Sequence, residues 1–428
     1  MDEVINENRL FKKKFAKNVA LIAGGTAFAQ IIGVLLSPIV TRIYSPDEFG
    51  VLTIFISILG AISLMGSLSY ESAIPIADDD IKAINIFSLS LIVLFLISIL
   101  LSIIIFCGGE YFLQVLNATE LINYKYFLII GFIMTGVYTI LDSWSLRTKN
   151  YKVIAMTKYS QSIIGNVGKI ILGMLRLGPS GLIFGQILGQ SAGIIYMFRP
   201  ILKNQKELLK SINMSSICWS AKRYVRFPKY SAPTILIISL SSQLPVYFLS
   251  AFYTSHTIGL YGLALTITFL PMSLIGKSVQ DVFFGEAASL GKSNPEEIKK
   301  LSQSLLRKLL VIGAVPMVIL SFLGPKLFSF IFGDNWIDAG TIASILTIYA
   351  YTHFIFHPIS TVFSIFEEQH LQLYLNLAKI VLIIIVFYIA KIFGFNAYYA
   401  IFLFSVVMGI TELLKFLLAH HVLNKRLV

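Results

Sequence analysis

Residues 84–107, INIFSLSLIVLFLISILLSIIIFC, contain no charged side chain over their whole length. A helix needs about 20 apolar residues to cross a hydrocarbon core of roughly 30 Å, and a helix satisfies its own backbone groups in lipid. This stretch therefore predicts a transmembrane helix.

Apolar stretches of similar length recur on both sides of it, along the whole chain. A soluble protein carries about 25% charged residues, whereas this chain has 13% charged and 56% hydrophobic residues. The sequence thus predicts an all-α membrane protein with about 12 transmembrane helices. Besides 84–107, we expect helices at 16–41, 50–76, 124–142, 151–173, 178–198, 229–253, 258–285, 304–324, 338–362, 370–391 and 396–420.

The net charge of +12 would suit a nucleic-acid binder, but its distribution indicates a membrane topology instead. With both termini in the cytoplasm, 24 of the 34 Lys and Arg residues fall in cytoplasmic segments and about five on the opposite side. This bias is the positive-inside signal of a polytopic membrane protein, and it favours an even number of helices. We therefore expect the protein to lie in a membrane and to bind no nucleic acid.

The longest connection between apolar stretches is polar and basic and spans residues 199–228. It divides six expected helices from six. The sequence therefore predicts an N-terminal lobe at 1–198 with helices one to six, a basic cytoplasmic linker at 199–228, and a C-terminal lobe at 229–428 with helices seven to twelve.

The two halves begin alike. At a constant offset of 209 residues, the turn after the first expected helix matches the turn after the seventh. Because each half has six helices, the two repeats are expected to run in the same sense, related by an axis along the membrane normal. The matching pairs are Tyr44 with Tyr253, Ser45 with Thr254, Phe49 with Ile258 and Gly50 with Gly259.

Four segments resemble a known family. They are AQIIG at residues 29–33, PIVTRIYSPDEFG at 38–50, SYESAI at 69–74 and IGLYGLA at 258–264. Together they resemble the Wzx-type O-antigen and polysaccharide flippases of the multidrug/oligosaccharidyl-lipid/polysaccharide exporter superfamily. The chain departs from the lipid II flippases of that superfamily, because no room remains for two further helices after the twelfth.

This resemblance implies a V-shaped exporter with two pseudo-symmetric six-helix lobes, a central cavity and alternating access, in the bacterial inner membrane. The implied cargo is an oligosaccharide on undecaprenyl pyrophosphate, an O-antigen or capsule repeat unit, carried from the cytoplasmic to the periplasmic leaflet for lipopolysaccharide or capsule synthesis. Expected partners are this lipid-linked oligosaccharide, H⁺ or Na⁺ as coupling ion, a polysaccharide polymerase and a chain-length regulator.

Ionisable side chains in or near the apolar stretches are the candidate substrate-binding residues. A pyrophosphate head and sugar hydroxyls need a hydrated path with cations and polar groups, and a mid-membrane charge normally faces such a cavity. Seven residues qualify: Arg42, Glu71, Lys158, Lys169, Lys277, Asp281 and Lys379.

Three lysines are the strongest of these candidates. Lys158 and Lys169 lie about three turns apart, so they share one face of the helix expected at 151–173. Lys379 lies near the middle of the eleventh expected helix, and no acidic residue stands within one turn of it. We expect all three to face a cavity.

The other candidates have two interpretations each. Arg42 either contacts phosphate or glycan, or snorkels to the interface. Glu71, placed near the end of the helix expected at 50–76, either pairs with a cation and takes part in proton coupling, or is a polar interfacial residue. Lys277 and Asp281, one turn apart, either neutralise each other or form a gate.

No catalytic residue, metal site or cofactor is expected. Cys107 and Cys218 lie far apart, and His353 and His357, one turn apart, lack the Glu of a zinc-peptidase helix. A membrane polysaccharide polymerase is disfavoured because the outer loops are short. A multidrug exporter of the same superfamily remains the alternative, although lysines within helices suit an anionic cargo better.

Overall fold

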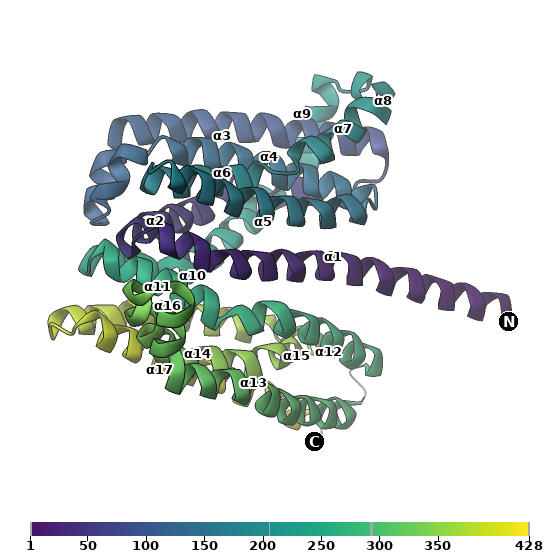
Figure 1. Ribbon diagram of the computed structural model, residues 1–428. Coiled ribbons are helices and arrows are strands. Elements are labelled where there is room, and N and C mark those ends of the chain that lie inside the picture. Colours follow the sequence, from purple (N-terminus) through teal and green to yellow (C-terminus); the bar gives the residue numbers. More distant parts are fainter. Residues whose placement is uncertain (1, 205, 292–293, 427–428) are drawn as a thin grey trace. The chain divides into compact units, whose positions relative to one another are not determined.

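The computed structural model describes residues 2–204, 206–291 and 294–426, and the regular structure in this part of the chain is helical throughout (Figure 1). The longer helices are α1 (Asp2–Ile43), α2 (Pro46–Ser63), α3 (Asp80–Val115), α4 (Phe127–Arg147), α5 (Tyr151–Met174), α6 (Pro179–Ser191), α7 (Ile194–Asn204), α9 (Met214–Arg223), α10 (Ala232–Phe252), α11 (Ser255–Thr268), α12 (Lys277–Leu290), α13 (Pro295–Phe332), α14 (Ile337–Phe356), α16 (Gln369–Ile392) and α17 (Ala397–Lys425).

The predicted all-α membrane fold is confirmed. Among the described residues, 10 helical spans are long and apolar enough to cross a membrane, and the bent pair α11–α12 brings the number to 11. The remaining member of the expected set is α5, which contains two lysines and two carboxamides that line a pocket described below. The protein is therefore a multi-pass membrane protein.

The second expected helix is shorter than its apolar pattern predicted. The prediction of one helix over 50–76 is wrong, because α2 ends at Ser63 and the chain then turns through η1 (Tyr70–Ala73). Leu68 and Ser69 have positive φ values of 51° and 63°, a conformation that interrupts a helix. Glu71 consequently lies on a short 3₁₀ turn and not near the end of a transmembrane helix.

Two other expected helices are broken at prolines. α11 and α12 are joined at 41° through Pro271 and the π-helical turn η4 (Met272–Gly276). α14 ends at Phe356 and is followed by the 3₁₀ turn η6 (His357–Thr361) and the short α15 (Val362–Ile365). Pro358 lies in that turn, and proline lacks the amide hydrogen that an α-helix requires.

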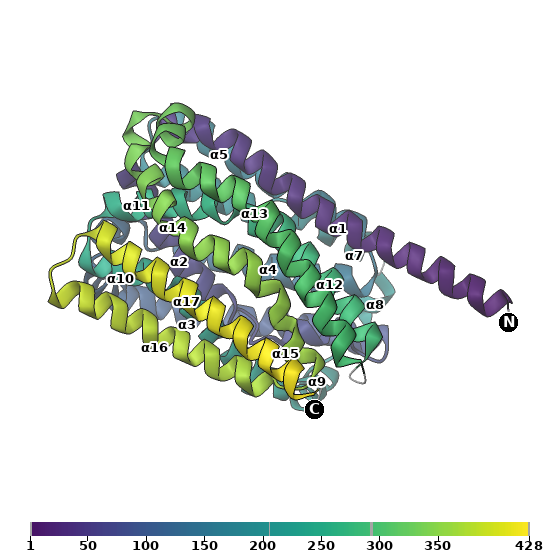
Figure 2. The ribbon, with the colours of Figure 1, turned by 90° about the horizontal axis from the view of Figure 1, so that it is seen from below.

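Two compact units make up the chain. The first unit contains residues 1–44 and 54–243, and the second contains residues 45–53 and 244–428. In the first unit α5 packs between α1 and α6, and α4 packs against α3 and α6. In the second unit α13, α14, α17 and α16 lie side by side in that order (Figure 2).

These units differ from the predicted lobes by two exchanged segments. The first turns of α2 belong to the second unit, because Gly50 and Thr53 pack against α11. The first half of α10 belongs to the first unit, because Ser239 and Gln243 contact the second half of α2. The division into transport lobes at 1–198 and 229–428 stays a prediction.

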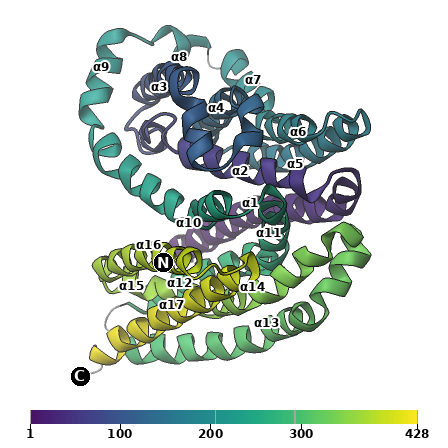
Figure 3. The same cartoon turned by 90° about the vertical axis from the view of Figure 1, so that its left-hand side faces the viewer.

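The segment expected as a linker, 199–228, is helical in most of its length. It contains the end of α7, the short α8 (Lys206–Lys210) and α9, which run around α3 (Figure 3). Asn85 of α3 accepts a hydrogen bond from the amide of Asn213 at 3.1 Å, and the Tyr70 hydroxyl donates to the Ala221 carbonyl at 3.1 Å. These bonds attach the segment to the first unit.

Residues that are equivalent under the 209-residue offset contact each other reciprocally. A Cβ on Gly50 would lie 2.0 Å from the Ser255 carbonyl oxygen, and a Cβ on Gly259 would lie 1.8 Å from the Pro46 carbonyl oxygen. Ser255 is Pro46 plus 209, just as Gly259 is Gly50 plus 209. The starts of α2 and α11 therefore pack as a pseudo-twofold pair.

Candidate functional site

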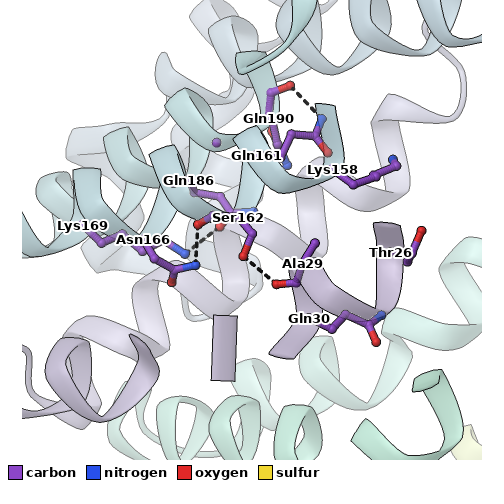
Figure 4. A pocket seen from close by; sticks show the side chains of 12 residues that line it. Thr26, Ala29, Gln30, Lys158, Gln161, Ser162, Asn166, Lys169, Gln186 and Gln190 are labelled. Atoms are coloured by element: carbon purple, nitrogen blue, oxygen red, sulfur yellow. Dashed lines mark hydrogen bonds between the residues drawn. The ribbon is translucent and has the colours of Figure 1, made fainter. Parts of the chain in front are cut away.

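A polar pocket of about 330 Å³ lies within the first unit, between α1, α5 and α6 (Figure 4). Both lysines predicted from α5, Lys158 and Lys169, line this pocket. No acidic side chain is among the described residues that line it, so the pocket is cationic. Its other polar side chains are Thr26, Gln30, Gln161, Ser162, Asn166, Gln186 and Gln190.

Glycines bring the helices around the pocket close together. A Cβ on Gly165 of α5 would lie 3.1 Å from the Cα of Gly189 on α6. A Cβ on Gly185 would lie 2.5 Å from the Cγ of Lys169. Because neither glycine carries a side chain, α6 approaches α5 closely, and the methylene chain of Lys169 lies directly against the α6 backbone.

Lys169 is held at both its backbone and its ammonium group. Its Nζ donates to Oε1 of Gln186 at 2.8 Å, and its carbonyl oxygen accepts a hydrogen bond from the Tyr44 hydroxyl at 2.8 Å. Tyr44 is 3% exposed. The first residue of the repeated motif thus supports the backbone of the lysine that lines the pocket.

Lys158 contacts an aromatic ring of α4. Its Nζ lies 4.9 Å from the centre of the Tyr138 ring, within the range of a cation–π contact. Asp142, also on α4, is close enough to interact with Lys158 electrostatically. The Oδ1 atom of Asp142 is buried without a hydrogen-bond partner among the described residues.

The carboxamides and hydroxyls of the pocket form a network that ties α1 to α5 and α5 to α6. Ser162 donates to the Ala29 carbonyl at 2.6 Å, and Gln161 donates to the Gln190 carbonyl at 3.4 Å (Figure 4). Thr135 of α4 donates to Oε1 of Gln190 at 3.0 Å. These amides are not among the ionisable residues predicted from the sequence, although five carboxamides in three apolar helices are a visible signal.

The other predicted site residues do not line this pocket. Arg42 is exposed in the last turn of α1, and Lys277 and Asp281 are exposed on α12 without an ion pair between them among the described contacts. Glu71 accepts a hydrogen bond from the Ser67 hydroxyl. Burial raises the pKa of the Glu71 carboxyl, although this hydrogen bond favours the ionised form.

Lys379 belongs to a second cluster of polar residues, inside the second unit. Its Nζ donates to the Tyr349 hydroxyl at 3.1 Å. Nearby, His353 Nδ1 lies 3.0 Å from Oε1 of Glu412, which is 2% exposed. Lys415 Nζ lies 3.4 Å from the same oxygen.

Glu412 is the functional candidate of the second unit that sequence reasoning missed. Its only signal was a Glu–Lys pair three residues apart within the otherwise apolar twelfth helix. No metal site was expected because the helix predicted to carry His353 and His357 lacks a suitably placed Glu. In the structure, a carboxylate from α17 reaches the two histidines of α14 and η6, and ligand atoms of all three lie within 4.8 Å of one another.

The polysaccharide biosynthesis protein family has a sequence model that matches residues 39–341. The chain belongs to that family. The match covers both halves of the repeat and most of the described helices. The match confirms the expected resemblance and includes the segments at 69–74 and 258–264 and all but the first residue of the segment at 38–50. No curated protein sequence matches the chain significantly.

Solved structures confirm the exporter fold. An inward-facing multidrug resistance MATE family transporter of the MOP superfamily matches with a TM-score of 0.76 at 15% identity, over 95% of this chain and 98% of that one. The lipid II flippase MurJ, in an inward closed conformation, matches with a TM-score of 0.65 at 18% identity, over 94% of this chain and 87% of that one. A MOP superfamily transporter from Pyrococcus furiosus matches with a TM-score of 0.53 at 14% identity, over 96% and 99%.

Proposed function

We propose that this member of the polysaccharide biosynthesis protein family is a flippase of the bacterial inner membrane, with both termini in the cytoplasm. It carries an undecaprenyl-pyrophosphate-linked oligosaccharide, an O-antigen or capsule repeat unit, from the cytoplasmic to the periplasmic leaflet by alternating access. The observation that carries this proposal is the cationic, amide-lined pocket between α1, α5 and α6.

The charge of the pocket supports an anionic cargo. Lys158 and Lys169 supply two ammonium groups, and no carboxylate among the described residues lines the same cavity. Among the described residues, the ammonium of Lys169 donates a hydrogen bond to the neutral Gln186 amide. Exchange of that amide for a phosphate oxygen forms a stronger, charge-assisted hydrogen bond.

The uncharged polar groups support a glycan as the other part of the cargo. Each Gln or Asn side chain offers both donors and acceptors, which matches the hydroxyl groups of a sugar. The five carboxamides come from three helices, so they surround the cavity. This pattern fits hydroxyl-rich cargo better than an apolar drug, whose pockets are mostly hydrophobic.

The proposed role is transport and not bond-breaking chemistry. H⁺ or Na⁺ is the proposed coupling ion, and a polysaccharide polymerase and a chain-length regulator are the proposed partners that use the flipped product. The family model and the lipid-linked cargo named for the MurJ structure support this assignment. Multidrug export is the competing function, because a multidrug resistance MATE transporter shares the fold.

The experiment uses a bacterial strain that lacks its own flippase but makes the cognate lipid-linked glycan. Surface polysaccharide is measured on gels while a tag reports the amount of protein in the membrane. We expect the double variant Lys158→Met with Lys169→Met to lose export at least about tenfold, because one charge-assisted hydrogen bond contributes about 1.5–3 kcal/mol.

The matched control is Lys152→Met, which removes an exposed lysine from the first turn of the same helix. It should export normally. Wild-type export by the double variant, at equal protein levels, would show that the pocket does not carry the cargo. Pocket-dependent efflux of a cationic dye, with glycan export unaffected, would favour the multidrug exporter instead.

A further inference from the structure

Three potential metal ligands converge inside the second unit, in a place that the proposed transport pocket does not use. His353 comes from the last turn of α14, His357 is the first residue of η6, and Glu412 lies in the middle of α17. One nitrogen of each histidine and one oxygen of the carboxylate all lie within 4.8 Å of one another.

The local fold explains why these side chains meet. The two histidines are one helical turn apart, so they share a face, and their ring centres are 4.3 Å apart. Helix α17 packs against α14 and presents Glu412 to that face, with Oε1 at 3.0 Å from His353 Nδ1. Two imidazoles and one carboxylate are a common ligand set for Zn²⁺.

His357 supplies the second, independent observation. Its Nδ1 atom is buried and has no hydrogen-bond partner among the described residues. A buried nitrogen without a partner is destabilising, and such groups in native proteins often mark an ion or water site. A metal ion bound through Nδ1 would satisfy this atom.

We propose that His353, His357 and Glu412 form a binding site for one Zn²⁺ ion, with the fourth position open. Zinc bonds of about 2.0–2.2 Å in a tetrahedron place the ligand atoms about 3.3 Å apart. The ligand atoms lie within 4.8 Å of one another, so rotation of the side chains is required to bring them to that spacing. The proposal does not depend on the proposed cargo, because none of these residues lines the pocket of the first unit.

Lys415 should lower the affinity of this site for a metal ion. Its Nζ lies 3.4 Å from Oε1 and 3.5 Å from Oε2 of Glu412. Binding of a metal at Oε1 leaves Oε2 in contact with the lysine. The same ammonium repels a divalent cation, and so does Lys379, which is close enough to Glu412 to interact electrostatically. Removal of Lys415 should therefore strengthen metal binding.

The test uses the full-length protein, purified in detergent and freed of metal with a chelator. Zn²⁺ is titrated by equilibrium dialysis with elemental analysis, and Co²⁺ serves as a spectroscopic probe of tetrahedral coordination. We expect one tightly bound equivalent in the wild type. Lys415→Met should raise the affinity at least about tenfold, because like charges this close repel by more than 1.4 kcal/mol even at an effective dielectric constant of 20.

Ligand variants decide between this site and surface binding. His357→Gln and Glu412→Gln should lose the tight equivalent, whereas His357→Cys should keep it, since a thiolate also binds zinc. His421→Gln removes an exposed histidine from the same helix as Glu412 and should bind like the wild type. The proposal is overturned by a wild type that binds no Zn²⁺, or by a His357→Gln protein that binds as tightly as the wild type.

Discussion

The Cα of Gly259 lies so close to Pro46 that a Cβ built on it would come within 1.8 Å of the Pro46 carbonyl oxygen. The reciprocal contact joins Gly50 to Ser255 at 2.0 Å. Asp47 and His256, also separated by 209 residues, lie beside these contacts with Oδ2 and Nδ1 3.0 Å apart. The shared glycines of the repeat are thus explained by a backbone contact that permits no side chain.

Gly259→Ala should destabilise the protein. The new methyl group would meet backbone atoms, which cannot rotate away, so overpacking of about 1–3 kcal/mol is expected. Thermal unfolding in detergent, followed by size-exclusion chromatography, measures the loss. Gly285→Ala is the control, because a Cβ there meets nothing within 4 Å. Equal melting temperatures for the two variants would contradict the contact.

Gly185→Ala should reduce export through a displaced lysine. A Cβ at Gly185 would lie 2.5 Å from Cγ and 2.7 Å from the backbone nitrogen of Lys169. Surface polysaccharide per unit of membrane protein is the measurement. Gly168→Ala, on the facing side of α5, makes only ordinary contacts of 3.4 Å or more and should export normally. Normal export by Gly185→Ala would mean that the position of Lys169 is unimportant.

Tyr44→Phe should cost more stability than Tyr253→Phe. Both hydroxyls donate to a backbone carbonyl, that of Lys169 at 2.8 Å and that of Phe395 at 3.0 Å. Tyr44 is buried, whereas Tyr253 is half-buried, and water replaces a lost bond more readily at the second site. We expect about 0.5–1.5 kcal/mol for Tyr44→Phe, measured by chemical or thermal unfolding. A larger loss for Tyr253→Phe would contradict this ranking.

Glu71→Gln should make the stability of the protein less dependent on pH. Burial raises the pKa of the Glu71 carboxyl above its ordinary value of 4.5, while the Ser67 hydrogen bond partly opposes the shift. A raised carboxyl pKa means that the folded state holds the proton more tightly, so ionisation weakens folding as pH rises above 4.5. The variant should therefore melt higher than the wild type at neutral pH.

The difference between the two melting temperatures should shrink as the pH falls below 4.5, because protonation of Glu71 then makes both side chains neutral. Asp79→Asn is the control, because its exposed carboxylate caps α3 by accepting from the Lys82 amide. A Glu71→Gln advantage that is constant over the whole pH range would show that the charge of Glu71 is not its cause.

The sequence alone predicted the features that depend on local pattern. The spacing of Lys158 and Lys169 on one helix face was sufficient to place both at one cavity. Three-dimensional neighbours were not predictable in the same way. Glu412 contacts His353 although the two are 59 residues apart in the sequence. The periodicity of a single helix does not predict such a contact. The end of α2 at Ser63 was missed because apolar residues continue through the turn that follows.

The polar face of α5 has a consequence for how the protein is made. On insertion scales a lysine at the centre of a membrane helix costs about 2.5–3.5 kcal/mol, and α5 carries Lys158 and Lys169 besides its carboxamides. Helix α1 covers this face from one side and α6 from the other. During synthesis α5 alone should therefore partition poorly from the translocon into the bilayer. We expect it to enter together with α6, as a helical hairpin that packs against α1.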